Sequence, residues 1–401
     1  MHDALSRLQP YPFEKLAQLK AAVRPAPKSA IDLSIGEPQH ETPPFILQAM
    51  TRHLPKMAKY PTTRGSDELR TALARWLRQR FKLPTHTLTA ERHVLPVSGT
   101  REGLFAIAQC VVDRTRAAPV VVMPNPFYQI YEGAALLAGA TPCFLNCTAA
   151  NQYTPDLKSV PEGIWQRCQL LYLCSPGNPT GNVLNRALYE QAFALADQFD
   201  FIIAADECYS EIYQREEKPP AGLLQIAAQA GRTDYRRCIV FHSLSKRSSV
   251  PGLRSGFVAG DADLLEKFLR YRTYHGCALP LPTQHASCAA WSDEAHVIEN
   301  RRLYRQKYDA VLPILKSALK VERPEGGFYL WPELPMDDVA FASGLLTQQN
   351  VTVLPGTYLA REAHGMNPGA RRVRMALVPP LAQCVEAAHR IKEFVETAGR
   401  K

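Results

Sequence analysis

Short apolar runs alternate with segments of helical period between about residue 93 and residue 260, and this alternation constrains the fold more than any other feature. The runs occupy residues 93–97, 119–123, 170–174, 201–206, 238–242 and 255–260. Runs this short, rich in β-branched residues and separated by helices, are typical of a mainly parallel sheet covered by helices on both faces. We therefore expect an α/β fold, with ligands bound beyond the carboxyl ends of its strands.

The pattern changes after about residue 276. A helix is predicted over residues 300–319, followed by strands within 326–331, 351–355 and 371–378 and by an amphipathic helix over 382–398. These elements predict a smaller α+β domain. We expect an N-terminal arm that also contributes to the small domain (residues 1–45), a large domain (46–275) and a small C-terminal domain (276–401).

Composition narrows the class of protein. The chain has 401 residues, 46% of them hydrophobic, which is enough for a large core. Its net charge is +9, but no block rich in lysine and arginine occurs, so anionic small molecules are favoured over nucleic acid as partners. No signal-peptide core or membrane-spanning run is present, so we expect a cytoplasmic protein without a membrane partner.

The ten cysteines lack the spacing of a metal site and are typical of free thiols in a reducing compartment. Cys143 and Cys147, the closest pair, are expected to pack in the core.

Two polar motifs each follow a predicted strand. Ser98-Gly99-Thr100 precedes a helix, where amide groups and a hydroxyl could hold an anion, or could serve only as a helix cap. The stretch "SPGNPTG" at 175–181 consists almost entirely of turn-forming residues. It is either an ordinary turn or a backbone shaped for a ligand, with the Asn178 amide offered to an oxygen.

Two further motifs bring charged side chains to strand ends. Asp206 ends a buried run, with Tyr209 just beyond, and a buried carboxylate is costly unless it meets a cation. A protonated pyridine nitrogen would be such a cation, and a helix cap or an internal ion pair is the alternative. In "SLSKRSSVPGLRSG", hydroxyls, glycines and Arg254 surround Lys246, as groups that bind phosphate would. Lys246 is then a counter-charge, or a nucleophile if its amine is kept neutral.

In this order, and together with Arg374 in "RVRMAL", these motifs resemble the fold-type I pyridoxal-phosphate-dependent aminotransferases over nearly the whole chain. The resemblance implies a mainly parallel sheet of seven-stranded type, sandwiched by helices, and a smaller α+β domain. It also implies pyridoxal 5′-phosphate as the cofactor, held covalently by Lys246, and no metal.

The resemblance assigns the other site residues. Asp206 would pair with the pyridinium nitrogen, Tyr209 and Asn178 would hydrogen-bond the ring oxygen O3′, and Tyr128, or else Phe127, would stack on the ring. The residues expected to hold the phosphate are Gly99, Thr100, Ser243, Ser245 and Arg254, and Ser98, also assigned to the cofactor site, would only complete that turn.

Three more residues are assigned to the substrate or to a second subunit. Arg374 would bind the substrate α-carboxylate in a fork that lysine cannot copy, and Gly36 would let the backbone approach the same substrate. Tyr60 would reach the phosphate of the other subunit, so the resemblance implies a homodimer.

Longer strings, such as "LQPYPFEKL", "LSIGEP" and "GGFYLWPE", resemble the proteobacterial succinyldiaminopimelate aminotransferases of lysine and diaminopimelate biosynthesis. This implies transamination between N-succinyl-LL-2,6-diaminopimelate and 2-oxoglutarate, giving N-succinyl-2-amino-6-oxopimelate and L-glutamate. Arg64, Arg101 and Arg247 could meet the remote carboxylate or the succinyl group, or could be solvated or paired within the fold.

Other functions share the same motifs. The cofactor residues also suit aminotransferases for aromatic amino acids, alanine or acetylornithine, and β C–S lyases, because the pocket and not the cofactor selects the bond. A regulatory or binding protein of the same fold would need only cofactor occupancy, and the presence of Lys246 and Arg374 counts against it.

Overall fold

The computed structural model describes residues 3–398, and its largest element is a seven-stranded sheet of order β2-β8-β7-β6-β5-β3-β4. Its strands are β2 (Val94–Val97), β3 (Val120–Asn125), β4 (Thr141–Asn146), β5 (Cys168–Cys174), β6 (Ile202–Asp206), β7 (Cys238–Ser243) and β8 (Gly256–Gly260). Strand β8 is antiparallel to both neighbours, and the pairs among β4, β3, β5, β6 and β7 are parallel. The predicted α/β fold with a mainly parallel sheet is therefore confirmed.

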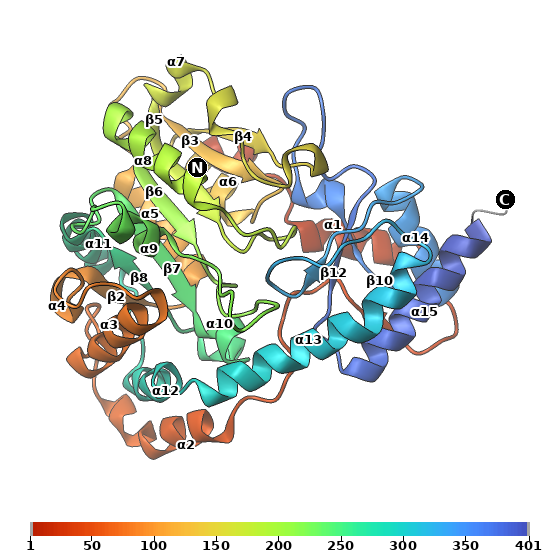
Figure 1. Ribbon diagram of the computed structural model, residues 1–401, viewed down its shortest axis with the longest axis horizontal. Coiled ribbons are helices and arrows are strands. Elements are labelled where there is room, and N and C mark those ends of the chain that lie inside the picture. Colours follow the sequence, from red (N-terminus) through yellow and green to blue (C-terminus); the bar gives the residue numbers. More distant parts are fainter. Residues whose placement is uncertain (1–2, 399–401) are drawn as a thin grey trace.

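Helices cover both faces of this sheet (Figure 1). One face packs against α5 (Thr100–Val111), α6 (Ile130–Leu137) and α11 (Ala262–His275), and the other against α3 (Asp67–Phe81), α8 (Arg186–Phe199), α9 (Leu223–Gln229) and α12 (Leu281–Trp291). Along β5, Leu170 and Tyr172 enter the first core, while Leu171 and Leu173 enter the second. Because both cores are apolar, the strand is a continuous hydrophobic run instead of an alternating one.

Strand β4 was not predicted. It lies at the edge of the sheet and pairs only with β3, and most of its side chains are half-buried. An edge strand needs fewer apolar residues than a central one. The stretch "TPCFLN" therefore lacks the continuous apolar run by which the other strands were predicted. All ten cysteines are free thiols; Cys147 is buried and Cys143 is half-buried.

Two small sheets lie beside the large one. In the first, β11 (Leu354–Pro355), β12 (Val373–Ala376) and β9 (Tyr329–Leu330) are antiparallel; in the second, β1 (Ile31–Asp32) pairs with β10 (Val351–Thr352) in parallel. Helices α13 (Ala295–Lys316), α14 (Asp338–Gln349) and α15 (Leu381–Ala398) pack on them, and α1 (Pro12–Ala21) contacts α14. Figure 1 shows the long α13 running from α12 toward these small sheets.

The N-terminal segment therefore joins the C-terminal elements through β1. Helix α12, which follows the predicted boundary at residue 275, packs in the core of the large sheet through Ala286 and Ala290. The short helices are α2 (Pro44–Arg52), α4 (Ala90–His93), α7 (Glu162–Trp165) and α10 (Leu244–Arg247). The three-part domain division stays a prediction. Within residues 3–398, no helix combines the length and hydrophobicity needed to cross a membrane.

Candidate active site

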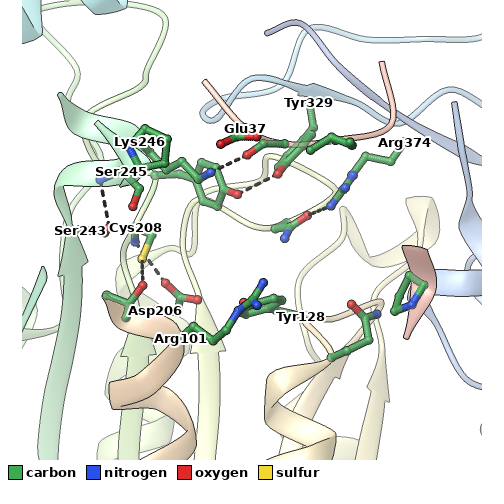
Figure 2. A pocket seen from close by; sticks show the side chains of 18 of the residues that line it. Glu37, Arg101, Tyr128, Asp206, Cys208, Ser243, Ser245, Lys246, Tyr329 and Arg374 are labelled. Carbon is green, nitrogen blue, oxygen red and sulfur yellow. Dashed lines mark hydrogen bonds between the residues drawn. The ribbon is translucent and has the colours of Figure 1, made fainter. Parts of the chain in front are cut away.

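A cavity of about 510 Å³ lies at the carboxyl ends of β2, β3, β5, β6 and β7. The N-terminal segment contributes Tyr11 and residues 35–37, and the small-sheet region contributes Tyr329 and Arg374. Figure 2 shows side chains from these separate parts of the chain around one space. The predicted site residues that line it are Gly36, Thr100, Tyr128, Asn178, Asp206, Tyr209, Ser243, Ser245, Lys246, Arg254 and Arg374.

Lys246 lies on α10, immediately after β7, and its side chain faces the cavity (Figure 2). Its ammonium group donates to the backbone carbonyl of Gly36. Burial lowers the pKa of Lys246 to about 8, and the nearby positive charges of Arg374 and Arg254 act in the same direction. A lysine whose amine is readily neutral is suited to act as a nucleophile or a base.

Asp206 ends β6 and is almost completely buried, with 5% of its surface exposed. Its carboxylate accepts hydrogen bonds from the Tyr131 hydroxyl (2.7 Å) and the Cys208 amide (3.2 Å). Burial raises the pKa of Asp206, and these two hydrogen bonds oppose the rise. The carboxylate is thus held by neutral donors at the wall of the cavity, where a cationic ligand group would compensate its burial.

Arg374 projects into the cavity from β12. Its Nη1 donates to Asn178 Oδ1 (3.1 Å) and its Nη2 to the Ser34 carbonyl (2.8 Å). The Nε–H is buried and has no hydrogen-bond partner within residues 3–398. Because buried N–H groups are rarely left unpaired, this donor fits a ligand carboxylate.

Tyr329 lies against Arg374, with the guanidinium 4.5 Å from the centre of its ring. The hydroxyl groups of Tyr209 and Tyr329 are 2.9 Å apart, and burial raises the pKa of Tyr209 well above its ordinary value, so Tyr209 stays protonated and can donate. A Cβ on Gly36 would come within 1.9 Å of the Tyr329 hydroxyl. Glycine is therefore required at residue 36 for the N-terminal segment to pass this close to the cavity.

The predicted phosphate residues gather around the start of α5 and around α10. Thr100, Ser243, Ser245 and Arg254 line the cavity. Gly99 caps α5 with a φ of +83°, and a Cβ there would come within 2.2 Å of the Arg254 guanidinium. Three hydroxyls, an arginine and the amide end of a twelve-residue helix form a pocket for a dianion.

An aromatic and cationic cluster forms another side of the cavity. Arg101 Nε donates to the Tyr128 hydroxyl (2.7 Å), and its Nη2 donates to the Tyr11 hydroxyl (3.4 Å). Tyr128 lines the cavity, whereas Phe127 is buried and stacks on Phe144 at 5.2 Å. Of the two predicted stacking candidates, Tyr128 therefore lies at the cavity and Phe127 in the core.

Other predicted residues lie outside the cavity. The Ser98 amide donates to Glu102 Oε2 (3.1 Å), and Tyr60 is fully exposed on this chain. Of the three arginines considered for the remote end of the substrate, only Arg101 lines the cavity. Arg247 is buried in an ion pair with Glu294, and Arg64 lies at the surface near Glu91. Arg247 is therefore paired within the fold and Arg64 is largely solvated, as the alternative to a substrate contact predicted.

Several cavity residues were not predicted, among them Tyr11, Glu37, Cys208 and Tyr329. Cys208 lies inside "DECY", between the two residues that were singled out, and Tyr329 lies in "GGFYLW", which was recognised only as a strand. Glu37 and Cys208 are each adjacent to a residue that was predicted, whereas no local spacing marks Tyr11 or Tyr329, because their position depends on long-range packing.

The family comparison agrees with this geometry. A family model described as aminotransferase class I and II matches residues 28–391. An aminotransferase from Neisseria meningitidis has a solved structure with 48% identity and a TM-score of 0.94, covering 98% of this chain and 100% of that one.

Two further relatives carry more specific names. An LL-diaminopimelate aminotransferase from Aquifex aeolicus is 31% identical over 98% of both chains. A structure of a probable N-succinyldiaminopimelate aminotransferase from Thermus thermophilus has 26% identity and a TM-score of 0.83, covering 96% of this chain and 100% of that one.

The chain belongs to the class I and II aminotransferases, whose cofactor is pyridoxal 5′-phosphate. The residues present fit this cofactor, since a buried carboxylate that accepts hydrogen bonds from neutral donors, a lysine of lowered pKa and a dianion pocket line one cavity.

Proposed function

We propose that this aminotransferase transfers the amino group of N-succinyl-LL-2,6-diaminopimelate to 2-oxoglutarate. The observation that carries the proposal is the presence of two arginines on different sides of the cavity, Arg374 and Arg101 (Figure 2). Both substrates carry a carboxylate at the reacting end and another at the remote end. The name of the Thermus relative and the sequence strings described above support the same substrate.

Each of the cavity residues has a separate role in this reaction. Pyridoxal phosphate, when bound, supplies the electron sink for the charge that develops at the substrate Cα. Lys246 would hold the cofactor and, once the substrate amine has replaced it, would take the Cα proton as a general base and deliver it as a general acid to the cofactor carbon that keeps the amino group. Asp206 would pair with the pyridinium nitrogen, and Tyr209 and Asn178 would donate to O3′. Arg374 binds the α-carboxylate.

The remaining contacts orient the cofactor. Tyr128 would stack on its ring, and Gly36 would let the substrate approach the N-terminal segment. The groups proposed to hold the phosphate are Gly99, Thr100, Ser243, Ser245 and Arg254, with Ser98 completing the turn.

The working unit is proposed to be a homodimer in which Tyr60 completes the partner's site. Tyr60 is fully exposed and belongs to a segment whose apolar side chains Leu54 and Met57 are 47% and 62% exposed. Exposed apolar side chains grouped in this way are typical of a surface covered by another protein. Mixing Tyr60→Phe with Lys246→Ala subunits and measuring the activity of the hybrids tests this assignment.

A second donor, LL-diaminopimelate itself, is favoured by the name of the Aquifex relative. The two donors share the reacting amino acid end and the remote carboxylate. They differ at the remote nitrogen, which is a cationic amine in one and a succinyl amide bearing a further carboxylate in the other. The substrates therefore differ in charge by two units at this end.

The test compares kcat/KM for different amino donors with 2-oxoglutarate as the acceptor. The reaction is monitored by the formation of glutamate. The donors are N-succinyl-LL-diaminopimelate, LL-diaminopimelate, N-acetylornithine, alanine and an aromatic amino acid. The proposal requires the highest value for the succinylated donor. A higher value for LL-diaminopimelate establishes the second candidate. Release of a thiol, pyruvate and ammonia from an S-substituted cysteine, offered as a further substrate, would establish a β C–S lyase instead.

A further inference from the structure

Tyr131 contacts the Asp206 carboxylate from α6, outside the set of residues that line the cavity. Its hydroxyl donates to Asp206 Oδ2 at 2.7 Å, and its side chain is fully buried. Burial and the charge of Asp206 raise the pKa of Tyr131 well above its ordinary value, so the hydroxyl keeps its proton and remains a donor.

The Tyr131 ring is held by two other aromatic rings. It stacks on Tyr172 with a centroid distance of 4.6 Å and an interplanar angle of 13°, and it meets Tyr128 edge-on at 5.9 Å and 82°. The Tyr172 ring is buried in the same core, and its hydroxyl donates to the Leu104 carbonyl (2.6 Å) and not to Tyr131. The Tyr131 hydroxyl therefore has a defined position, set by packing on both the sheet and the cavity side.

Asp206 needs such a contact because its backbone position does not fix the orientation of its carboxylate. The strand fixes Cα and Cβ, but the terminal torsion of an aspartate is broad and roughly two-fold. Tyr131 holds Oδ2, and the Cys208 amide holds Oδ1. Without Tyr131, one carboxylate oxygen would lose its hydrogen bond and the group could rotate.

We propose that Tyr131 is a positioning residue that holds the Asp206 carboxylate in the orientation in which it meets the cofactor. The inference rests on the proposed pairing of Asp206 with the pyridinium nitrogen. It adds a role for α6, whose residues would orient both the ring contact at Tyr128 and the counter-ion at Asp206.

The test compares Tyr131→Phe with Tyr172→Phe. Each variant loses one buried hydroxyl and one hydrogen bond and keeps a ring of the same size, so both retain the packing of the core. Only Tyr131→Phe changes a contact to Asp206. The purified proteins are stripped of cofactor and titrated with pyridoxal phosphate to obtain the dissociation constant. Absorbance of the loaded proteins against pH and thermal unfolding of the stripped proteins complete the measurement.

We expect Tyr131→Phe to weaken cofactor binding about tenfold, the value of one hydrogen bond to a charged group. In Tyr131→Phe, the pH at which the absorbance band of the Lys246-bound cofactor changes should be higher than in the wild type. A poorly held counter-ion leaves the pyridine nitrogen less positive, which makes the cofactor-bound nitrogen of Lys246 more basic. Tyr172→Phe should lower the unfolding temperature of the stripped protein about as much as Tyr131→Phe does. It should leave the dissociation constant within about twofold of wild type and the pH of the absorbance change within about 0.3 unit.

Asp206→Asn tests the proposed pairing of Asp206 with the cofactor separately from the positioning role of Tyr131. If Asp206 pairs with the cofactor, Asp206→Asn weakens binding, and adding Tyr131→Phe to it causes little further loss, because both changes act on one contact. Wild-type binding in Tyr131→Phe, or an equal additional loss in the double variant, overturns the positioning role. Wild-type binding in Asp206→Asn overturns the proposed pairing and the positioning role with it.

Discussion

Replacing Arg374 with lysine keeps the positive charge but removes the geometry on which substrate binding is proposed to depend. Two of the guanidinium nitrogens are already engaged, by Asn178 and by the Ser34 carbonyl, and Nε is buried without a partner among the described residues. A lysine cannot keep both contacts and also offer a second N–H to a carboxylate. Losing one charge-assisted hydrogen bond and the contact with the Tyr329 ring costs about 2–4 kcal/mol. This corresponds to a fall in kcat/KM of about 30- to 1,000-fold.

The assay is steady-state glutamate formation with a fixed 2-oxoglutarate concentration, and Arg372→Lys is the matched control. Arg372 lies just before β12, donates to the Trp331 carbonyl (3.1 Å) and pairs with Glu333 (3.5 Å), all outside the cavity. Its replacement should change kcat/KM less than about threefold, as expected for the loss of a partly exposed ion pair. Wild-type activity in Arg374→Lys, or an equal loss in both variants, would refute the reasoning.

Two other substitutions test the remote carboxylate site and the reactive lysine. Arg101→Gln should raise the KM for 2-oxoglutarate about tenfold, while leaving the KM for pyruvate, which lacks the remote carboxylate, nearly unchanged; equal changes for both oxo acids would contradict this role. In the protein without cofactor, the pKa of Lys246 is about 8, against 10.5 for an unperturbed lysine, because burial disfavours its charged form. Between these two pH values the unfolded chain holds more protons than the folded protein, so stability rises with pH. Lys246→Met should therefore raise the free energy of unfolding by up to about 3 kcal/mol at pH 7, and by progressively less toward pH 10.5. Lys307, whose pKa burial also lowers to about 8 and which donates to the Val378 carbonyl, is the control, since Lys307→Met should give the same pH dependence but keep cofactor binding. Denaturant unfolding at several pH values measures the free energy of unfolding of both variants. An increase in this free energy from Lys246→Met that does not depend on pH would contradict the lowered pKa.

The sequence was sufficient for six of the seven strands of the large sheet, because the central strands are buried on both faces and form continuous apolar runs, whereas the edge strand β4 was missed. It was also sufficient for most of the candidate site, since parallel strands bring their carboxyl ends to one edge. This geometry places Asp206 at the end of β6 and Lys246 after β7 in the same cavity.

The residues that were missed depend on packing between distant elements. Tyr131 reaches Asp206 from α6, and Tyr329 reaches Tyr209 from a two-residue strand of the small sheet. Neither contact has a characteristic spacing in the sequence. The preference for Tyr128 over Phe127 came from the family resemblance, and the structure is consistent with it, since Tyr128 lines the cavity and Phe127 is buried in the core.

The most direct test of the proposed reaction is the absorbance of the cofactor-loaded protein during addition of N-succinyl-LL-diaminopimelate in the absence of an oxo acid. The account predicts loss of the band of the Lys246-bound cofactor, a rise of the amine-form band, and complete reversal when 2-oxoglutarate is added. A protein that binds pyridoxal phosphate but shows no change with this donor would contradict the proposed substrate. If LL-diaminopimelate then produced the full change, the second candidate would take its place.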